Sequence, residues 1–371
     1  MYNSCICAES AYRNGQYAQT TSQLSTIHSS YTLNKRQVHR NRPFYIYYHR
    51  DMDGIVSTVL LKLLLTVRYQ HNPKAIKGIP VDFDIKATWR TTRLRQPAAV
   101  VDFLYHKDAL IYYDHHNGPF VDDFKDHFDA RSDEEYVHLE EGASSAARVL
   151  FADLGPLLRV ELGDRFKNIE DIVTQADIID NAKFNSSSGW FDCEFDLAKL
   201  NLILQQHRYV LPMNRTNRFC NKLVLDLSEI DCTKLLRDDY YTKLFASAKS
   251  WSEEQKERIK SALCYRNGVI FYNSVIYNVP FLRFYPYEIY PNACFIIAIY
   301  RKGGIYEVSV GRNPFRHHNI KMSIGELCEK FGGGGHQDVG GIQFGSYEEA
   351  YDASLKVVNI LEPSAYDLPQ L

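Results

Sequence analysis

The sequence predicts an α/β protein whose parallel sheet is covered by helices on both faces. Three short apolar runs, at 44–48, 98–101 and 109–113, have the composition of buried strands. Helical segments alternate with these runs, and the first is the long apolar stretch from Ile55 to Tyr69. Continuous apolar strands separated by helices are typical of a parallel sheet, so we expect one here.

The chain divides into four predicted segments. The three apolar runs, with helical stretches at 144–154 and 169–180, assign 43–190 to a first domain. Residues 191–262 are mostly helical, which predicts a connector or an insertion. Strand-like runs near 269–277, 293–300 and 306–310, followed by a helix near 324–331, predict a smaller α/β domain over 263–362.

The first 42 residues are predicted to form a flexible extension. They are rich in polar residues and tyrosine, and Glu9 is their only acid, so they offer little for a core. An acid-poor start that contains arginine is also compatible with organelle targeting. The eight cysteines include no C-x-x-C pair, which favours reduced thiols in an intracellular protein. We therefore expect a cytoplasmic location and a solvated tail.

Length and charge restrict the possible functions. A chain of 371 residues can form two cores of ordinary size. A net charge of -2 argues against an extended electrostatic grip on long nucleic acids, so phosphate binding should be local. No apolar run approaches the ~18 residues that a membrane span requires, so no membrane partner is expected. P-loop, nucleophile-elbow, zinc-protease and dinucleotide-binding motifs do not occur.

Carboxylates and imidazoles follow each apolar run. They are His49, Asp51, Asp53, Asp102, Asp114 and His115. Because the carboxyl ends of parallel strands share one sheet edge, we expect these side chains to converge. Such a cluster would repel itself, and divalent cations relieve that repulsion. Oxygen ligands with some imidazole and no thiolate suit manganese or magnesium better than structural zinc.

These motifs resemble those of the DHH family of phosphoesterases over roughly 43–190 and 264–345. HRDMDG at 49–54 is similar to the first motif, Asp102 to the second, and Asp114-His115-His116 to the third. The fourth is an aspartate on or after a helix, best matched by Asp177, with Asp180 as the competing candidate. The glycine-rich stretch 331–341 resembles the signature of the associated C-terminal domain.

The resemblance implies two manganese ions, with magnesium as the alternative. One ion would be held by His49 and Asp51, the other by Asp53, His115 and Asp177, and Asp102 would bridge them. Asp114 would orient an imidazole. His116 would contact the scissile phosphate or deliver a proton. Two metals can activate water for attack on phosphorus, so no protein nucleophile is required.

The C-terminal stretch supplies the candidate substrate contacts. Gly333, Gly334 and Gly335 permit backbone approach to a phosphate, although a mobile surface loop is the alternative. His336 would offer a hydrogen bond to the substrate. Arg312 matches the position at which the family places a basic phosphate-binding residue, and a solvated strand-end arginine is its alternative.

The sequence therefore predicts a manganese-dependent phosphoesterase. By resemblance, its substrates are short oligonucleotides, linear dinucleotides or 3′,5′-bisphosphate nucleotides. A single-strand exonuclease or an exopolyphosphatase on the same scaffold is the alternative. A nucleotide-binding regulatory protein without catalysis is an alternative of another class. The presence of a suitable residue at every metal-ligand position argues against it. A homodimer is left open as the oligomeric state.

Overall fold

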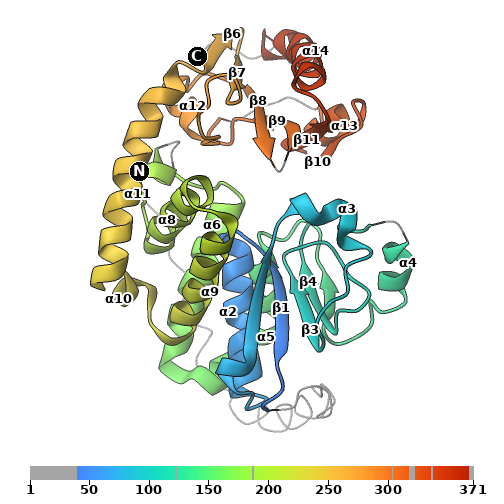
Figure 1. The fold of residues 1–371 in the computed structure, drawn as a ribbon, viewed down its shortest axis with the longest axis vertical. Helices are drawn as coiled ribbons and strands as arrows, with labels where there is room; N and C mark the ends of the chain where they lie inside the picture. The colour runs from blue at the N-terminus through green and yellow to red at the C-terminus, as the bar shows by residue number, and fades with distance from the viewer. Residues whose placement is uncertain are drawn as a thin grey trace, which may run out of the picture.

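The structure is a computed structural model that describes residues 40–366 apart from 122, 186–187, 303, 317–321 and 336. The predicted extension therefore lies almost wholly outside the described residues, and so does His336. Figure 1 shows two sheets at the two ends of the molecule, linked along one side by a long helix. No helix in the described part of the chain has the length and apolarity needed to cross a membrane.

The first sheet has five parallel strands in the order β2-β1-β3-β4-β5. Their bounds are β1 Phe44–His49, β2 Ile76–Val81, β3 Ala98–Val101, β4 Ile111–Asp114 and β5 Val137–Leu139. This arrangement confirms the predicted parallel α/β sheet. The sequence did not predict β2 or β5. Strand β2 (IKGIPV) carries a glycine and a proline and lies at the sheet edge, where proline is tolerated.

Helices and loops cover both faces of this sheet. On one face, the almost fully buried α2 (Met52–Val67) packs against α5 (Ala146–Leu162), α6 (Phe166–Asp180) and α9 (Met213–Glu229). The other face is covered by an aromatic cluster that includes Trp89 and Phe103. The elements there are η2 (Phe83–Ile85), α3 (Lys86–Trp89) and α4 (Phe124–Asp129). Two further short 3-10 helices are η1 (Pro73–Ala75) and η3 (Gly163–Arg165).

Helix α2 begins three residues before the apolar stretch that predicted it. Asp51 is its N-cap, and its side chain accepts a hydrogen bond from the Gly54 amide at 3.0 Å. A Cβ atom at Gly54 would lie 2.1 Å from the His49 carbonyl oxygen, so glycine is needed where the strand turns into the helix. The HRDMDG motif is therefore both the strand-to-helix turn and the helix start.

The helical segment after the first domain contributes to the first core as well as linking the two sheets. It contains α7 (Gly189–Asp192), α8 (Asp196–Val210), α9, α10 (Cys232–Leu236) and α11 (Asp239–Lys260). Buried leucines of α8 and α9 belong to the same hydrophobic cluster as α2. The 22 residues of α11 extend over about 33 Å, from beside α10 and α8 to the second sheet (Figure 1).

The second sheet has six strands in the order β10-β11-β9-β8-β7-β6. Only β7 and β8 pair in parallel, and the other neighbours are antiparallel. The strands are β6 Leu263–Arg266, β7 Val269–Asn273, β8 Phe295–Lys302, β9 Ile305–Arg312, β10 Gly334–Gly335 and β11 Val339–Phe344. The accompanying helices are α12 (Tyr285–Ile289), α13 (Ile324–Glu329) and α14 (Tyr347–Tyr366). The predicted second domain of strands and helices is thereby confirmed, and its sheet is mixed.

The first core yields a stability prediction. Leu64 on α2 is 0% exposed, whereas Leu225 on α9 is 42% exposed. We expect Leu64→Ala to lower the free energy of unfolding by about 2–5 kcal/mol, because it leaves a cavity in the buried cluster to which α2 belongs. Leu225→Ala, the matched control, should change it by less than ~0.5 kcal/mol. Urea unfolding followed by circular dichroism measures both, and equal losses would contradict the packing described.

Candidate metal centre

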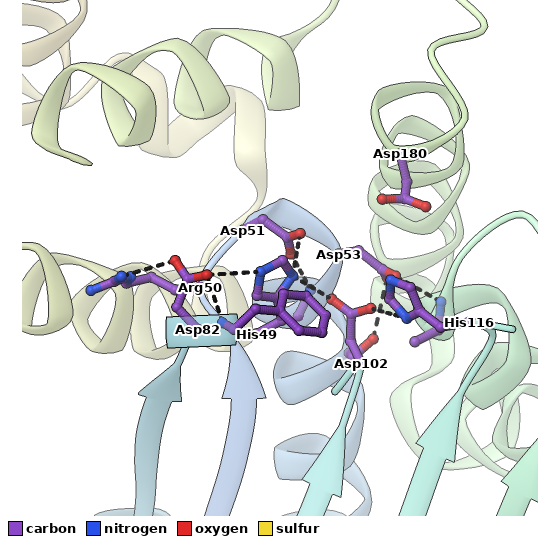
Figure 2. A network of polar contacts seen from close by, with 12 residues as sticks. His49, Arg50, Asp51, Asp53, Asp82, Asp102, His116 and Asp180 are labelled. Atoms are coloured by element: carbon purple, nitrogen blue, oxygen red, sulfur yellow. Dashed lines mark hydrogen bonds and ion pairs between the residues drawn. The ribbon is translucent and has the colours of Figure 1, made fainter. Parts of the chain in front are cut away.

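Four strands of the first sheet end at one edge, and each delivers a side chain there. His49 ends β1, Asp82 follows β2, Asp102 follows β3 and Asp114 ends β4. This is the edge at which parallel sheets bind ligands. Figure 2 shows His49, Asp82 and Asp102 converging above the strand ends, with Asp180 directed toward them from a helix. The sheet topology alone therefore assembles most of the site.

Three groups of side chains in the described chain could each hold a metal ion. They are His49, Asp51 and Asp102; Asp53, His115 and Asp180; and Asp102, His115 and His116. Within each group the ligand atoms lie within 4.8 Å of one another. Asp102 and His115 each belong to two groups. The centre thus consists of neighbouring candidate sites that share ligands. Asp102 lies between His49 on one side and His115 and His116 on the other.

Distances from His49 and His115 to the surrounding carboxylates define the cluster. His49 Nδ1 lies 2.6 Å from Asp51 Oδ2 and 3.7 Å from Asp102 Oδ2. His115 Nε2 lies 3.6 Å from Asp53 Oδ2, 3.8 Å from Asp102 Oδ1 and 3.4 Å from Asp180 Oδ2. Hydrogen bonding to the Ala143 carbonyl engages His115 Nδ1 at 3.1 Å, which leaves Nε2 for the cluster.

Asp102 is the most exceptional residue of the centre. Its side chain is 1% exposed, and neither carboxylate oxygen has a hydrogen-bond partner among the described residues. Its backbone has a φ of 54°, a left-handed conformation that aspartate adopts more readily than most residues. Burial, followed by the charges of Asp53 and Asp51, raises the pKa of Asp102 well above its ordinary value. A buried carboxylate without a partner is costly unless a cation compensates it.

The neighbouring carboxylates show the same electrostatic conflict. Burial and the nearby Asp53 raise the pKa of Asp180 to about 7. Burial also raises the pKa of Asp53, although its oxygens accept the Ala146 and Ala147 amides at 2.7 and 2.8 Å. Divalent cations would let all three carboxylates ionise together. The donor set contains oxygen and imidazole nitrogen without thiolate, so the residues fit manganese or magnesium.

The three residues Asp114, His115 and His116 have different surroundings, and Asp114 holds His116 in place. Asp114 is fully buried and accepts hydrogen bonds from Tyr112 Oη at 2.9 Å and from the His115 amide at 2.9 Å. Its Oδ1 also lies 2.8 Å from His116 Nδ1. Burial alone would lower the pKa of His116, but Asp114 raises it to about 9. Asp114 thus fixes an imidazole that favours the protonated form.

Of the two candidate aspartates on α6, the structure places Asp180 in a ligand group and Asp177 outside them. Asp177 lies outside the ligand groups, where Arg148 Nε donates to its Oδ2 at 2.8 Å and Ser145 Oγ to its Oδ1 at 2.7 Å. Asp180, at the end of the same helix, is the residue brought to His115. The two positions differ by about 4.5 Å along the axis. We therefore replace Asp177 by Asp180 as the candidate ligand.

Asp82 was missed by the sequence analysis. It follows β2, is 2% exposed, and has Oδ1 3.7 Å from His49 Nε2. Its Oδ2 accepts hydrogen bonds from Arg50 at 2.9 Å and Arg208 at 3.1 Å. Figure 2 shows Asp82 and Arg50 beside His49, at the opposite end of the cluster from His116. Asp82 could have been found from its position directly after a strand. It was not, because β2 was not predicted as a strand.

The second sheet forms the opposite wall of a cavity of about 620 Å³. His115 and His116 line it from the first sheet, and Arg312 and Asp338 from the second. Arg312, at the end of β9, donates to Asp338 Oδ1 at 3.0 Å and to the Met322 carbonyl. The structure therefore brings Arg312 into the cleft that the histidines line.

The glycine run has a structural role in the second sheet. Gly334 and Gly335 form β10, which pairs with β11. A Cβ atom at Gly333 would lie 2.1 Å from the Gly341 carbonyl oxygen, and one at Gly335 2.3 Å from the Val339 carbonyl oxygen. Close backbone packing thus requires Gly333 and Gly335, whereas a Cβ atom at Gly334 would meet no atom within 4 Å. The predicted role of Gly333, Gly334 and Gly335 in phosphate binding remains a prediction. His336 lies outside the described residues.

No family model and no curated protein sequence matches the chain. Its fold is similar to that of a pGpG-specific phosphodiesterase, PggH, from Vibrio cholerae, with a TM-score of 0.61 and 18% identity over 87% of this chain and 100% of that one. It is also similar to the DHH domain of a member of a ribosomal protein family, with a TM-score of 0.51 and 16% identity over 87% of this chain and 88% of that one. At these identities the likeness shows a shared fold.

The two aspartates on α6 provide a matched test of the metal centre. We expect Asp180→Asn to weaken Mn²⁺ binding by at least about tenfold, because it removes a carboxylate that faces the cluster. Asp177→Asn should change Mn²⁺ affinity by less than about threefold, because this carboxylate pairs with Arg148. Isothermal titration calorimetry with MnCl₂ measures both affinities. The reverse ranking would return the role to Asp177.

Proposed function

We propose that this protein, which shares the fold of DHH-domain proteins, is a divalent-metal-dependent phosphoesterase that acts on short phosphorylated nucleotides. The observation that carries the proposal is Asp102, a buried carboxylate without a hydrogen-bond partner in the described chain. It stands between two histidine-containing groups at the ligand-binding edge of a parallel sheet. A shared carboxylate in that position suits a pair of cations better than a single one.

The residues divide between two proposed ions. His49 and Asp51 would hold one, Asp53, His115 and Asp180 the other, and Asp102 would belong to both. Manganese is the preferred ion and magnesium the alternative, on the chemistry of the donors. When bound, such ions activate water and neutralise charge on the phosphoryl oxygens. The protein needs no nucleophile of its own for this chemistry.

The chain itself supplies a proton donor. Asp114 engages His116 Nδ1, so Nε2 remains for the cavity that His116 lines. Tyr112 donates to the other oxygen of Asp114 and fixes the carboxylate. An imidazolium held in this way can donate to a phosphoryl oxygen or to the leaving oxygen. We therefore assign substrate contact to His116 and positioning to Asp114.

The size of the cleft favours small substrates. Cavities of about 570 and 620 Å³ lie on the two sides of the ligand cluster, and such volumes suit small-molecule ligands. The near-neutral charge of the chain supports the same conclusion. The structural neighbour from V. cholerae, described as acting on pGpG, makes linear dinucleotides the first class to test. A single-strand exonuclease or an exopolyphosphatase remains the alternative on the same site.

A side-by-side hydrolysis assay tests this function. Purified protein with Mn²⁺ is offered linear dinucleotides, two-to-five-nucleotide RNA, a ~50-nucleotide single strand, bisphosphate nucleotide and polyphosphate. We expect release of mononucleotides or phosphate from the small nucleotide substrates, and none after chelation of the metal. Processive digestion of the long strand would favour the exonuclease instead. Nucleotide binding without any hydrolysis would favour a regulatory protein.

A variant pair shows whether the activity belongs to this site. Asp102→Asn should lower kcat/KM by more than about a hundredfold, since even residues that only support metal ligands contribute ~10–100-fold. Asp133→Asn, an exposed aspartate after α4, is the matched control and should leave kcat/KM unchanged. Full activity of Asp102→Asn would move the active site away from the cluster.

A further inference from the structure

A separate cavity lies next to the one that borders the metal centre. This cavity of about 550 Å³, which we call the rear cavity, is lined by residues of α8, α11, β8 and the loop after β7. Figure 1 shows α11 passing α8 on its way to the second sheet. Tyr209, Phe281, Tyr300 and Arg301 also line the cavity of about 570 Å³ beside Asp180, but none of the described metal-centre residues lines the rear cavity. The rear cavity therefore adjoins the cleft without including the metal centre.

A hydrogen bond between two distant parts of the chain lies at the boundary of these cavities. Tyr209 Oη, from the end of α8, donates to the Phe281 carbonyl oxygen at 2.9 Å. Phe281 belongs to the loop between β7 and α12. Because both residues line both cavities, a ligand in the rear cavity would contact a wall of the cleft from behind.

Two stacked pairs of aromatic rings line the rear cavity. The rings of Tyr209 and Trp251 have centroids 5.9 Å apart and an interplanar angle of 27°. Those of Phe281 and Tyr300 have centroids 4.9 Å apart and an interplanar angle of 11°. None of these four side chains is fully buried, and Tyr209 is 48% exposed. Planar rings with accessible surface are the partners on which nucleobases stack.

The rear cavity is also positively charged. Arg258 and Arg301 line it, and no aspartate or glutamate is among the described residues of its lining. Arg258 Nη1 donates to Gln255 Oε1 and its Nη2 to the Asn278 carbonyl oxygen, both at 2.8 Å. These acceptors are neutral, so they orient the guanidinium group without compensating its charge. A guanidinium group has five N–H donors, so donors remain for an anion.

Structural roles account for only part of this arrangement. Arg258 lies in the last turn of α11, where a cation interacts favourably with the helix dipole. The stack of Tyr209 on Trp251 holds α8 against α11. Neither role requires an open cavity whose volume falls within the range of small-molecule sites. Rings, a cation and such a volume together match a ligand that has one planar base and one phosphate.

We propose that the rear cavity binds a nucleoside monophosphate, whose base stacks against the Tyr209–Trp251 pair and whose phosphate pairs with Arg258. A guanidinium group presents paired donors that match phosphate oxygens. The site goes beyond the proposed function, because it is distinct from the metal centre and binds its ligand without metal or hydrolysis. It gives the protein a second nucleotide site, which Tyr209 and Phe281 separate from the first.

Trp251 provides a direct probe of this site. The protein is titrated in EDTA with AMP, GMP, CMP and UMP while tryptophan fluorescence is followed. We expect at least one monophosphate to quench the fluorescence saturably below about 1 mM, the upper end of ordinary substrate affinities. The nucleoside of the same base should bind at least about tenfold more weakly, because it lacks the phosphate that Arg258 holds. Ribose 5-phosphate, which lacks the base, should not quench.

Variants assign the response to particular residues. Trp251→Phe keeps a ring for stacking, so it should abolish the quenching while the affinity measured by calorimetry stays within about threefold. Arg258→Gln should weaken binding of the monophosphate at least about tenfold and leave binding of the nucleoside unchanged. Arg258→Lys keeps the charge but loses the paired donors, so it should retain part of the affinity. Arg208→Gln, the matched control, alters the cavity beside the metal centre and should change neither affinity.

The outcomes distinguish the rear cavity from other binding sites. Absence of saturable quenching by every monophosphate would overturn the proposal, as would equal affinities for nucleotide and nucleoside. Quenching that persists in Trp251→Phe would place the ligand elsewhere. Loss of binding in Arg208→Gln but not in Arg258→Gln would place it in the metal cleft. The titration contains no free metal, so failure of the hydrolysis assay leaves its result unaffected, and the two proposals fail separately.

Discussion

The site depends on one electrostatic constraint, which is the burial of Asp102 among other carboxylates. Its two oxygens find no hydrogen-bond donor in the described chain, and Asp51, Asp53 and Asp180 surround it. Such an arrangement is unfavourable by itself, because burial and like charge both oppose ionisation. It becomes favourable when cations occupy the space between the groups. We therefore expect metal binding to stabilise the strand ends.

The residues around Asp102 also hold the surrounding helices. Asp51 caps α2, and Asp53 accepts the first two amides of α5 while facing His115. Carboxylates at helix N-termini are stabilised by the helix dipole and the free amides. The same side chains thus position the helices and the ligand atoms, and the sheet sets their common edge. A change in any of them is expected to affect folding and metal binding together.

Much of this could be predicted from the sequence, because the key strands are apolar runs that end in histidine or aspartate. Strands β1, β3 and β4 and the convergence of His49, Asp102 and Asp114 follow from that pattern. Strand β2 did not, since its glycine and proline interrupt the apolar pattern, and Asp82 was lost with it. The choice between Asp177 and Asp180 depends on where α6 ends relative to the sheet. Arg208 meets Asp82 across 126 positions, which local patterns do not encode.

Direct location of manganese tests the central claim that Asp102 serves a pair of cations. Crystals grown with MnCl₂ and measured at the manganese absorption edge give the ion positions by anomalous scattering. We expect two peaks about 3.5–4 Å apart, both within coordination distance of Asp102, one beside His49 and one beside His115. The absence of any peak at Asp102 in crystals that bind manganese elsewhere would contradict the account.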